Sequence, residues 1–211
     1  MNERLAAFHP LWKGAEKPGA PVVLLLHGTG GDERQLFPLT RQICGQNDIS
    51  FLGVRGQVRE GSSNRFFRRF GEGVFDEEDI VRRANDLAEA LELASTEYGF
   101  KLTRLYALGF SNGANIAAAL MLLRPEVLAD AVMLRPMLPL TPEALPQLAG
   151  KGALLLSGER DPWGPPDSAR ALANLLSSGG AEVLHRVLPA GHGLIDEDLE
   201  CAGEWFSARW K

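Results

Sequence analysis

Hydrophobic and polar residues follow two patterns that alternate along the chain. Short runs rich in leucine or β-branched residues are separated by longer segments in which apolar residues recur every three or four positions. Runs that are apolar throughout are typical of strands buried on both faces of a parallel sheet, whereas a three-to-four spacing is typical of an amphipathic helix. The runs predict strands at residues 22–26, 49–54, 104–108, 131–134, 153–156 and 182–188.

The helical spacing predicts a long helix over residues 76–98 and a last helix over about 196–210. Acidic residues fill the first turn of the long helix, where the helix dipole favours them, and Gly99 is expected to end it. A further helix is expected over 168–176, with Asp167 as its cap. Two segments, 56–73 and 137–150, match neither pattern, and loops of that length in a compact domain often carry function. This order of elements predicts an α/β fold with a mostly parallel central sheet flanked by helices.

Length and composition favour one domain over residues 1–211. The chain has 211 residues, 45% of them hydrophobic, and a net charge of −5, so neither nucleic acid nor an anionic membrane is an expected partner. No signal peptide is expected in residues 1–14, and the longest apolar run, 116–123, is too short to cross a bilayer. Cys44 and Cys201 lie in no metal-binding pattern and are expected to be buried free thiols. We therefore expect a cytoplasmic protein; its oligomeric state is not determined by the sequence, and a homodimer is left open.

The most informative segment is Gly109-Phe-Ser-Asn-Gly, which joins a predicted strand to a helix of small residues. This order of strand, tight turn and helix is that of a nucleophile elbow, with Ser111 as the nucleophile. Its two glycines are expected because a Cβ at either position would collide with the neighbouring strand or helix. The alternative is an ordinary serine in a glycine-rich turn.

A serine hydroxyl needs a base, and that base needs an orienting acid; in α/β hydrolases these follow in the chain order serine, acid, histidine. His9 and His27 precede Ser111 and are set aside as bases. His185 lies within a predicted strand, whereas His192 lies in a loop after it, so His192 is the predicted base. Asp161, just after the strand at 153–156, is the predicted acid, with Glu159 as the alternative.

The negative charge that develops on a substrate carbonyl requires two backbone N–H donors. One is expected from Asn112, the residue after the nucleophile, and the other from Thr29 in the glycine-rich loop after the first strand. His27, at the start of that loop, is expected to order it by hydrogen bonding. The loop lacks both the spacing of a dinucleotide-binding loop and the Gly-Lys-Ser/Thr of a phosphate-binding loop.

Several motifs spread over nearly the whole chain carry a family resemblance. They are His27-Gly-Thr-Gly-Gly-Asp-Glu, Arg55-Gly, Arg65-Phe-Phe-Arg-Arg, Gly109-Phe-Ser-Asn-Gly-Ala-Asn, Arg135-Pro-Met-Leu-Pro, Gly158-Glu-Arg-Asp-Pro and Ala190-Gly-His-Gly. Together they resemble the phospholipase/carboxylesterase family of small α/β hydrolases, in particular a bacterial branch related to dienelactone hydrolases and acyl-protein thioesterases. The resemblance implies an α/β-hydrolase fold with a Ser-Asp-His triad, and hydrolysis of carboxylic esters without a metal or organic cofactor.

We therefore expect a serine esterase acting on small or medium carboxylic esters. The chain length leaves little room for a lid, which disfavours bulky lipids. The alternatives are a thioesterase or lysophospholipase with the same triad, because only the pocket distinguishes these substrates, and a non-catalytic binding protein of the same fold.

The unassigned segment 56–73 is expected to form one wall of the pocket. It interleaves Arg65, Arg68 and Arg69 with phenylalanines, and guanidinium groups suit carboxylates, so one or more of these arginines is a candidate to bind an anionic part of the substrate. The alternative is that they form ion pairs with nearby acidic residues while the phenylalanines anchor the loop.

Overall fold

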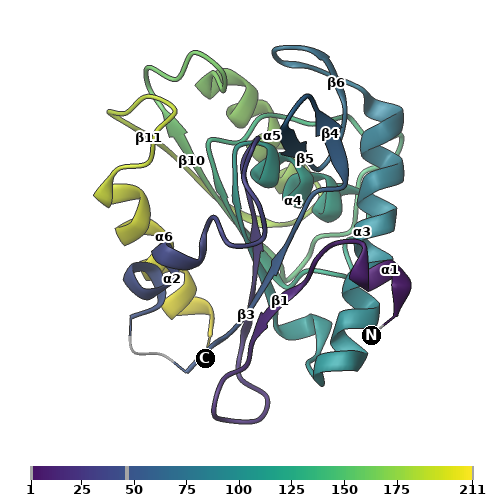
Figure 1. Cartoon of the computed structure of the whole chain (residues 1–211). Coiled ribbons are helices and arrows are strands. Elements are labelled where there is room, and N and C mark those ends of the chain that lie inside the picture. Colours follow the sequence, from purple (N-terminus) through teal and green to yellow (C-terminus); the bar gives the residue numbers. More distant parts are fainter. Residues whose placement is uncertain (1, 46–47, 211) are drawn as a thin grey trace.

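The computed structural model describes residues 2–45 and 48–210 and contains a twisted sheet of seven strands with helices on both faces (Figure 1). The strand order is β1-β3-β2-β8-β9-β10-β11. Only β1 runs antiparallel to its neighbour, and the other five pairings are parallel. The carboxyl ends of six strands therefore meet at one edge of the sheet, where ligands bind in open α/β sheets.

The strands of this sheet are β1 (Leu11–Lys13), β2 (Val22–Leu26), β3 (Ser50–Val54), β8 (Leu105–Phe110), β9 (Asp130–Leu134), β10 (Gly152–Gly158) and β11 (Glu182–Leu188). Two small antiparallel hairpins lie outside it, β4 (Val58–Glu60) with β5 (Ser63–Arg65), and β6 (Arg69–Gly71) with β7 (Val74–Phe75). The helices are α1 (Glu3–Ala6), α2 (Phe37–Cys44), α3 (Glu77–Tyr98), α4 (Asn112–Leu123), α5 (Pro166–Ser178) and α6 (Asp196–Arg209), with a short 3-10 turn at Leu102–Arg104.

Alternate residues of the buried strands belong to two hydrophobic cores, one on each face of the sheet. In β2, Leu24 and Leu26 join the core beneath α3, α4 and α5, whereas Val23 and Leu25 join the core beneath α2 and α6. This division follows from the two-residue period of a strand. Because both faces are covered, the strand has no polar side, which explains its unbroken apolar sequence.

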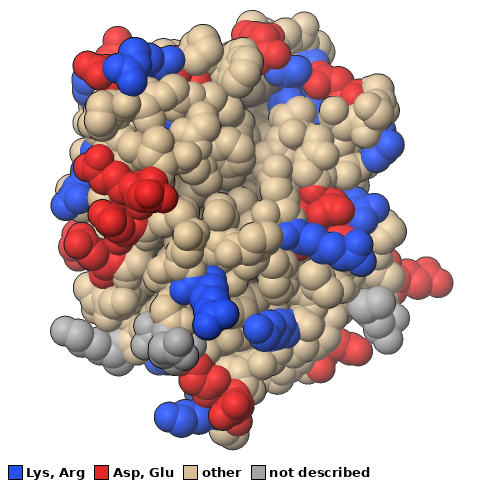
Figure 2. All heavy atoms as spheres, turned by 60° about the vertical axis from the view of Figure 1, so that its left-hand side comes forward, with Lys and Arg blue, Asp and Glu red and all other residues tan. Residues whose placement is uncertain are grey.

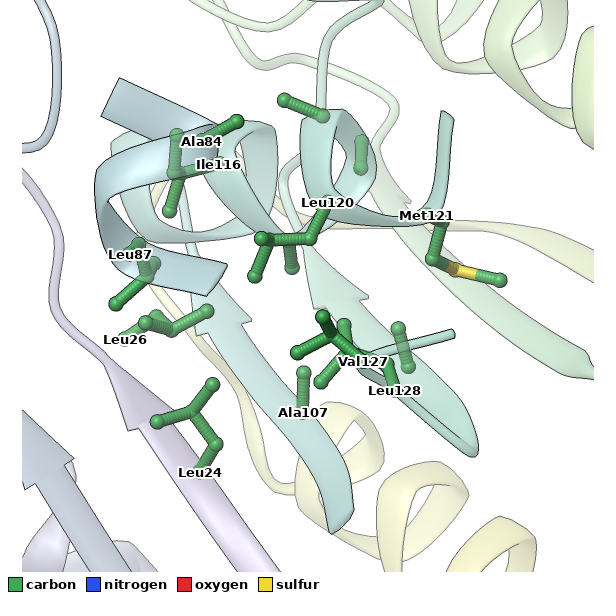
Figure 3. Close-up of a cluster of buried hydrophobic side chains, with 14 of the residues drawn as sticks. Leu24, Leu26, Ala84, Leu87, Ala107, Ile116, Leu120, Met121, Val127 and Leu128 are labelled. Carbon is green, nitrogen blue, oxygen red and sulfur yellow. The ribbon is translucent and has the colours of Figure 1, made fainter. Parts of the chain in front are cut away.

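The helix that follows the central strand is itself almost wholly buried. Ile116 and Leu120 of α4 belong to the same buried cluster as Leu24 and Leu26 of β2 and Leu87 of α3 (Figure 3). Four alanines in α4 keep it close to the sheet, and the eleven residues from Asn112 to Leu122 are all buried. Since each fully buried leucine or isoleucine contributes about 1.5–3 kcal/mol, this packing anchors the start of α4 firmly.

The sequence predicts the six central parallel strands and the helices α3, α4, α5 and α6, with shifts of a few residues at their ends. It does not predict β1, a three-residue edge strand, or α2. The segment 56–73, expected to be a loop, contains β4, β5 and β6. The expected cap is wrong: Asp167 lies inside the first turn of α5, where it pairs with Arg170 at 2.7 Å, and the residue at the cap is Pro165. Proline supplies no side-chain acceptor but has the extended backbone that a helix start requires.

Charged side chains form small groups of both signs. On the face shown in Figure 2, acidic and basic groups surround a broad uncharged area, and the described residues form no continuous basic patch there. Cys44 and Cys201 are both buried, as expected, and burial raises the pKa of the Cys44 thiol to about 12. None of the described helices is long and apolar enough to span a membrane.

Candidate active site

Ser111 occupies a strained turn between β8 and α4. Its backbone has φ 53° and ψ −114°, a conformation that residues with a side chain rarely adopt. The two flanking glycines make the turn sterically possible: a Cβ on Gly109 would lie 2.4 Å from the carbonyl oxygen of Gly113, and a Cβ on Gly113 would lie 2.0 Å from that of Leu26. The Ser111 N–H donates to the carbonyl of Leu134 at 2.8 Å, which ties the turn to β9. The turn thus presents the hydroxyl at the amino terminus of α4.

His192 and Asp161 meet Ser111 from the loops after β11 and β10. The His192 Nε2 atom lies 3.0 Å from the Ser111 Oγ atom, and its Nδ1 atom lies 2.8 Å from the Asp161 Oδ2 atom. The other oxygen of Asp161 accepts the backbone N–H groups of Trp163 (2.9 Å) and Gly164 (3.1 Å), so the carboxylate cannot rotate freely. The imidazole also contacts the rings of Phe110 and Trp163, at centroid distances of 5.2 and 5.0 Å.

The other histidines and carboxylates considered from the sequence lie elsewhere. Glu159 is exposed and has no contact with His192 among the described residues. His185 in β11 forms a hydrogen bond with Ser157 of β10 at 2.9 Å. His9 is exposed and precedes β1. Of the four histidines, the structure therefore brings only His192 to Ser111.

The glycine-rich loop after β2 lies beside the elbow, and Thr29 and Asn112 both line the cleft that contains Ser111. Asn112 is the first residue of α4, whose leading N–H groups have no partner within the helix. A Cβ on Gly28 would come within 2.8 Å of the Phe110 ring, so any other residue there would require a shift of that ring. His27 orders this loop as expected: its Nε2 atom accepts the Gly56 N–H at 2.9 Å while its Nδ1–H donates to the carbonyl of Gly28 at 2.7 Å.

The end of β5 and the residue after it hold the two expected donor residues in place. The Arg65 guanidinium donates to the Thr29 hydroxyl at 2.8 Å, and the Phe66 N–H donates to the Asn112 side-chain carbonyl at 2.7 Å. The Gly30 N–H donates to the carbonyl of Asn64 at 2.9 Å. Consecutive residues of one segment thus contact both sides of the expected oxyanion site.

The cleft above Ser111 has a volume of about 300 Å³. Part of its wall is apolar, formed by Phe75, Phe110, Met137 and Trp163. Polar and charged side chains of the wall include Arg65, Arg69, Glu72 and Asn115. The cleft therefore offers both an apolar surface and charged groups. Segment 56–73 contributes to its wall, as expected from the sequence.

Several known hydrolases resemble this chain in sequence and fold. The chain is 40% identical to the putative hydrolase MhqD of Bacillus subtilis over 88% of this chain and 92% of that protein. The carboxylesterase of Bacillus cereus has the same fold, with a TM-score of 0.91 and 38% identity over 98% of this chain and 99% of its own. The Mesorhizobium loti carboxylesterase gives 0.88 and 34% over 95% of each chain. No protein-family model matches the chain. The chain belongs to the phospholipase/carboxylesterase-type α/β hydrolases.

A buried ion pair in this hydrolase was not predicted from the sequence. Arg135 directly follows β9 and has φ 56°, and its guanidinium pairs with both oxygens of Asp198 at 2.7 Å, with both side chains fully buried. The same guanidinium donates to the carbonyls of Gly191 (2.8 Å) and Gly193 (2.9 Å), the residues on either side of His192. Arg135 therefore holds the loop that carries the histidine. The sequence did contain a signal for this role, because Arg135 directly follows a predicted strand and belongs to one of the motifs that carry the family resemblance.

The three arginines of segment 65–69 have different surroundings. Arg65 and Arg69 line the cleft, whereas Arg68 does not: its side chain is 57% exposed and pairs with Asp76, the cap of α3, at 2.7 Å. Asp76 also accepts the Asp79 N–H, so Arg68 stabilises the start of α3. For Arg68 the structure favours the ion-pair alternative. Among the described residues, no group of three or more histidine, cysteine or acidic side chains could hold a metal ion.

Proposed function

We propose that this hydrolase cleaves small or medium carboxylic esters with Ser111 as the nucleophile. The observation that carries the proposal is the unbroken chain of contacts from the Ser111 hydroxyl through His192 to Asp161, at 3.0 and 2.8 Å, at the floor of a cleft. A serine on a nucleophile elbow, a histidine and a buried carboxylate in this order form the arrangement that acyl transfer requires.

The Asp161 contact supports His192 as the base. A carboxylate only accepts hydrogen bonds, so the Nδ1 atom of His192 carries the hydrogen and the Nε2 lone pair faces the Ser111 hydroxyl. His192 takes the hydroxyl proton as the Ser111 oxygen bonds to the ester carbonyl carbon. The carbonyl oxygen becomes an oxyanion, for which the Thr29 and Asn112 N–H groups are the proposed donors.

Collapse of that intermediate breaks the ester bond and completes the acyl-enzyme. His192 passes its proton to the departing alkoxide, which leaves as the alcohol. Water then attacks the acyl carbon, giving its proton to His192, and the Ser111 oxygen recovers that proton as the carboxylic acid leaves. Asp161 keeps the imidazole in the required tautomer and stabilises its protonated form.

The cleft volume supports small or medium esters over long-chain lipids, because about 300 Å³ is at the lower end of small-molecule sites. A thioester is the nearest competing substrate, since the same groups would attack it and only contacts in the pocket would discriminate.

Covalent labelling tests the nucleophile directly. The protein is treated with a fluorophosphonate probe and digested, and the modified peptide is located by mass spectrometry. We expect one modified residue, Ser111, and loss of activity in proportion to labelling. Labelling at another serine, or ester hydrolysis that continues in the fully labelled protein, would contradict the proposal. Parallel assays with aryl esters and thioesters of graded chain length then identify the preferred acyl group.

A further inference from the structure

Arg65 is a buried cation in the wall of the catalytic cleft. Its side chain is 4% exposed, and its charge is incompletely matched by the protein. The Nη1 atom donates to the Thr29 hydroxyl at 2.8 Å, and the Nε atom donates to the carbonyl of Phe67 at 3.2 Å. Both acceptors are neutral. A carboxylate oxygen of Glu60 lies 3.8 Å from Nη1, and the hydrogen bonds of Arg65 among the described residues involve Nε and Nη1 but not Nη2.

Arg69, which also lines the cleft, forms ion pairs with two carboxylates. Arg69 binds both oxygens of Glu60 at 2.9 Å and an oxygen of Glu72 at 2.6 Å. Arg69 therefore occupies Glu60 and Glu72, the two acidic residues whose charges act on Arg65. Burial lowers the pKa of Arg65, and the adjacent charge of Arg69 lowers it further, although a guanidinium stays protonated in proteins.

A buried charge without an ionic partner at hydrogen-bond distance is costly, and in the wall of a cleft a charged ligand can supply that partner. A guanidinium presents its donors in a planar fork that matches the two oxygens of a carboxylate. Since Arg65 contacts Thr29, a carboxylate bound there would lie close to the carbonyl being attacked at Ser111.

We propose that Arg65 binds a carboxylate of the substrate, so that the enzyme prefers small esters that carry a second, anionic group. This inference rests on the proposed esterase function and specifies its substrate class. The carboxylate can belong to the acyl part, as in a half-ester of a dicarboxylic acid, or to the alcohol part, as in an acylated hydroxy acid.

Two matched substrate pairs distinguish these sources. The acyl pair is 4-nitrophenyl hexanoate and 4-nitrophenyl hydrogen adipate, which have acyl chains of equal length. The alcohol pair is 4-methylphenyl acetate and 4-acetoxybenzoate. For each pair, the ratio of kcat/KM for the anionic ester to that for the neutral ester is measured in the wild type, Arg65→Gln, Arg65→Lys and the control Arg68→Gln.

We expect the wild type to favour the anionic member of at least one pair, and Arg65→Gln to lower that ratio about 10- to 100-fold, as for the loss of a charged hydrogen bond. Arg68→Gln should leave the ratio unchanged, because Arg68 lies outside the cleft. Arg65→Lys should recover part of the preference. This ratio distinguishes binding of the substrate carboxylate by Arg65 from the support that Arg65 gives to Thr29. Loss of the Thr29 contact would slow hydrolysis of both esters equally and leave the ratio unchanged.

An unchanged ratio in Arg65→Gln would overturn the inference and leave Arg65 as a support for Thr29. Hydrolysis of the neutral esters with no preference in the wild type would overturn it while preserving the proposed function, whereas failure to cleave any ester would contradict the proposed function itself. A second measurement uses only the wild type, so it does not depend on the folding of a variant. Adipate should inhibit hydrolysis of the hexanoate ester competitively, whereas 1,6-hexanediol, which has no carboxylate, should not. Equal effects of the two compounds would also overturn the inference.

Discussion

Two serine–histidine pairs lie among the described residues, and one of them has the surroundings of a catalytic pair. Ser111 and His192 are separated by 3.0 Å, and Ser157 and His185 by 2.9 Å. The first pair lies in a cleft, on a strained turn, with Asp161 behind the histidine. The second joins two neighbouring strands, and its serine is fully buried.

The second pair also lacks an acid. No described carboxylate contacts His185, and burial, followed by the positive charge of Arg170, lowers the pKa of that histidine. By the triad mechanism, a hydrogen bond between a serine and a histidine does not by itself make a catalytic pair. An accessible hydroxyl, a carboxylate that sets the tautomer and space for a substrate are also required.

The largest expected effect contrasts the two serines. Ser111→Ala should lower kcat for ester hydrolysis by on the order of 10⁶, because removing the nucleophile disables the whole triad. Ser157→Ala should change kcat less than threefold, since the Ser157 hydroxyl bonds His185 and neither residue lines the cleft. Steady-state assays with 4-nitrophenyl butyrate measure both. Comparable losses in the two variants would remove the functional distinction between the pairs.

The second prediction tests the carboxylate that the Ser111–His192 pair has and the Ser157–His185 pair lacks. Asp161→Asn should lower kcat by on the order of 10⁴, because an amide no longer selects the productive histidine tautomer. Glu159→Gln is the matched control, two positions away and exposed, and it should retain nearly full activity. Similar losses in both variants would mean that the contact of 2.8 Å between Asp161 and His192 does not serve catalysis.

A third prediction concerns how each histidine is held. His185 is fixed by its strand, whereas the His192 loop depends on Arg135 and its buried partner Asp198. Asp198→Asn should lower the free energy of unfolding by about 3–5 kcal/mol, because it leaves the Arg135 charge buried without its partner.

Urea unfolding and thermal melts measure this loss, and the activity of the folded fraction should also fall as the loop loosens. Asp167→Asn removes a carboxylate from an exposed pair with Arg170 and should cost no more than about 0.5 kcal/mol. A loss for Asp198→Asn as small as that of this control would show that the buried pair is dispensable.

The smallest effect concerns pH and the second pair. Because burial lowers the pKa of His185 in the folded protein, the unfolded chain takes up a proton first as the pH falls below about 6.5. The unfolded state then binds more protons, so the stability contributed by neutral His185 decreases as the pH drops toward the lowered pKa.

In His185→Gln the decline of the unfolding free energy between pH 7 and 5 should be shallower than in the wild type. It should not vanish, because burial also lowers the pKa of His27. Ester hydrolysis at pH 7 should stay near the wild-type rate. An identical pH dependence in the two proteins would contradict the inferred cost of charging His185.

Much of the fold and of the candidate site could be predicted from local features. The strand β2 could be located because both of its faces are buried, which leaves five consecutive apolar residues. The elbow could be located because its strained turn demands glycine at two fixed positions around Ser111. The edge strand β1 escaped prediction, since three residues paired on one side carry too little of a pattern.

The sequence by itself determined the type of each central element, the position of Ser111 and the short set of residues that could assist it. These follow from local backbone geometry and from the regular spacing of buried side chains along strands and helices. Only the tertiary structure placed Asp161 rather than Glu159 against His192, joined Arg135 to Asp198 across 63 residues, and gave the adjacent Arg68 and Arg69 different partners. Such contacts depend on the order of strands in the sheet and on the directions in which loops leave it, which chain neighbours do not encode.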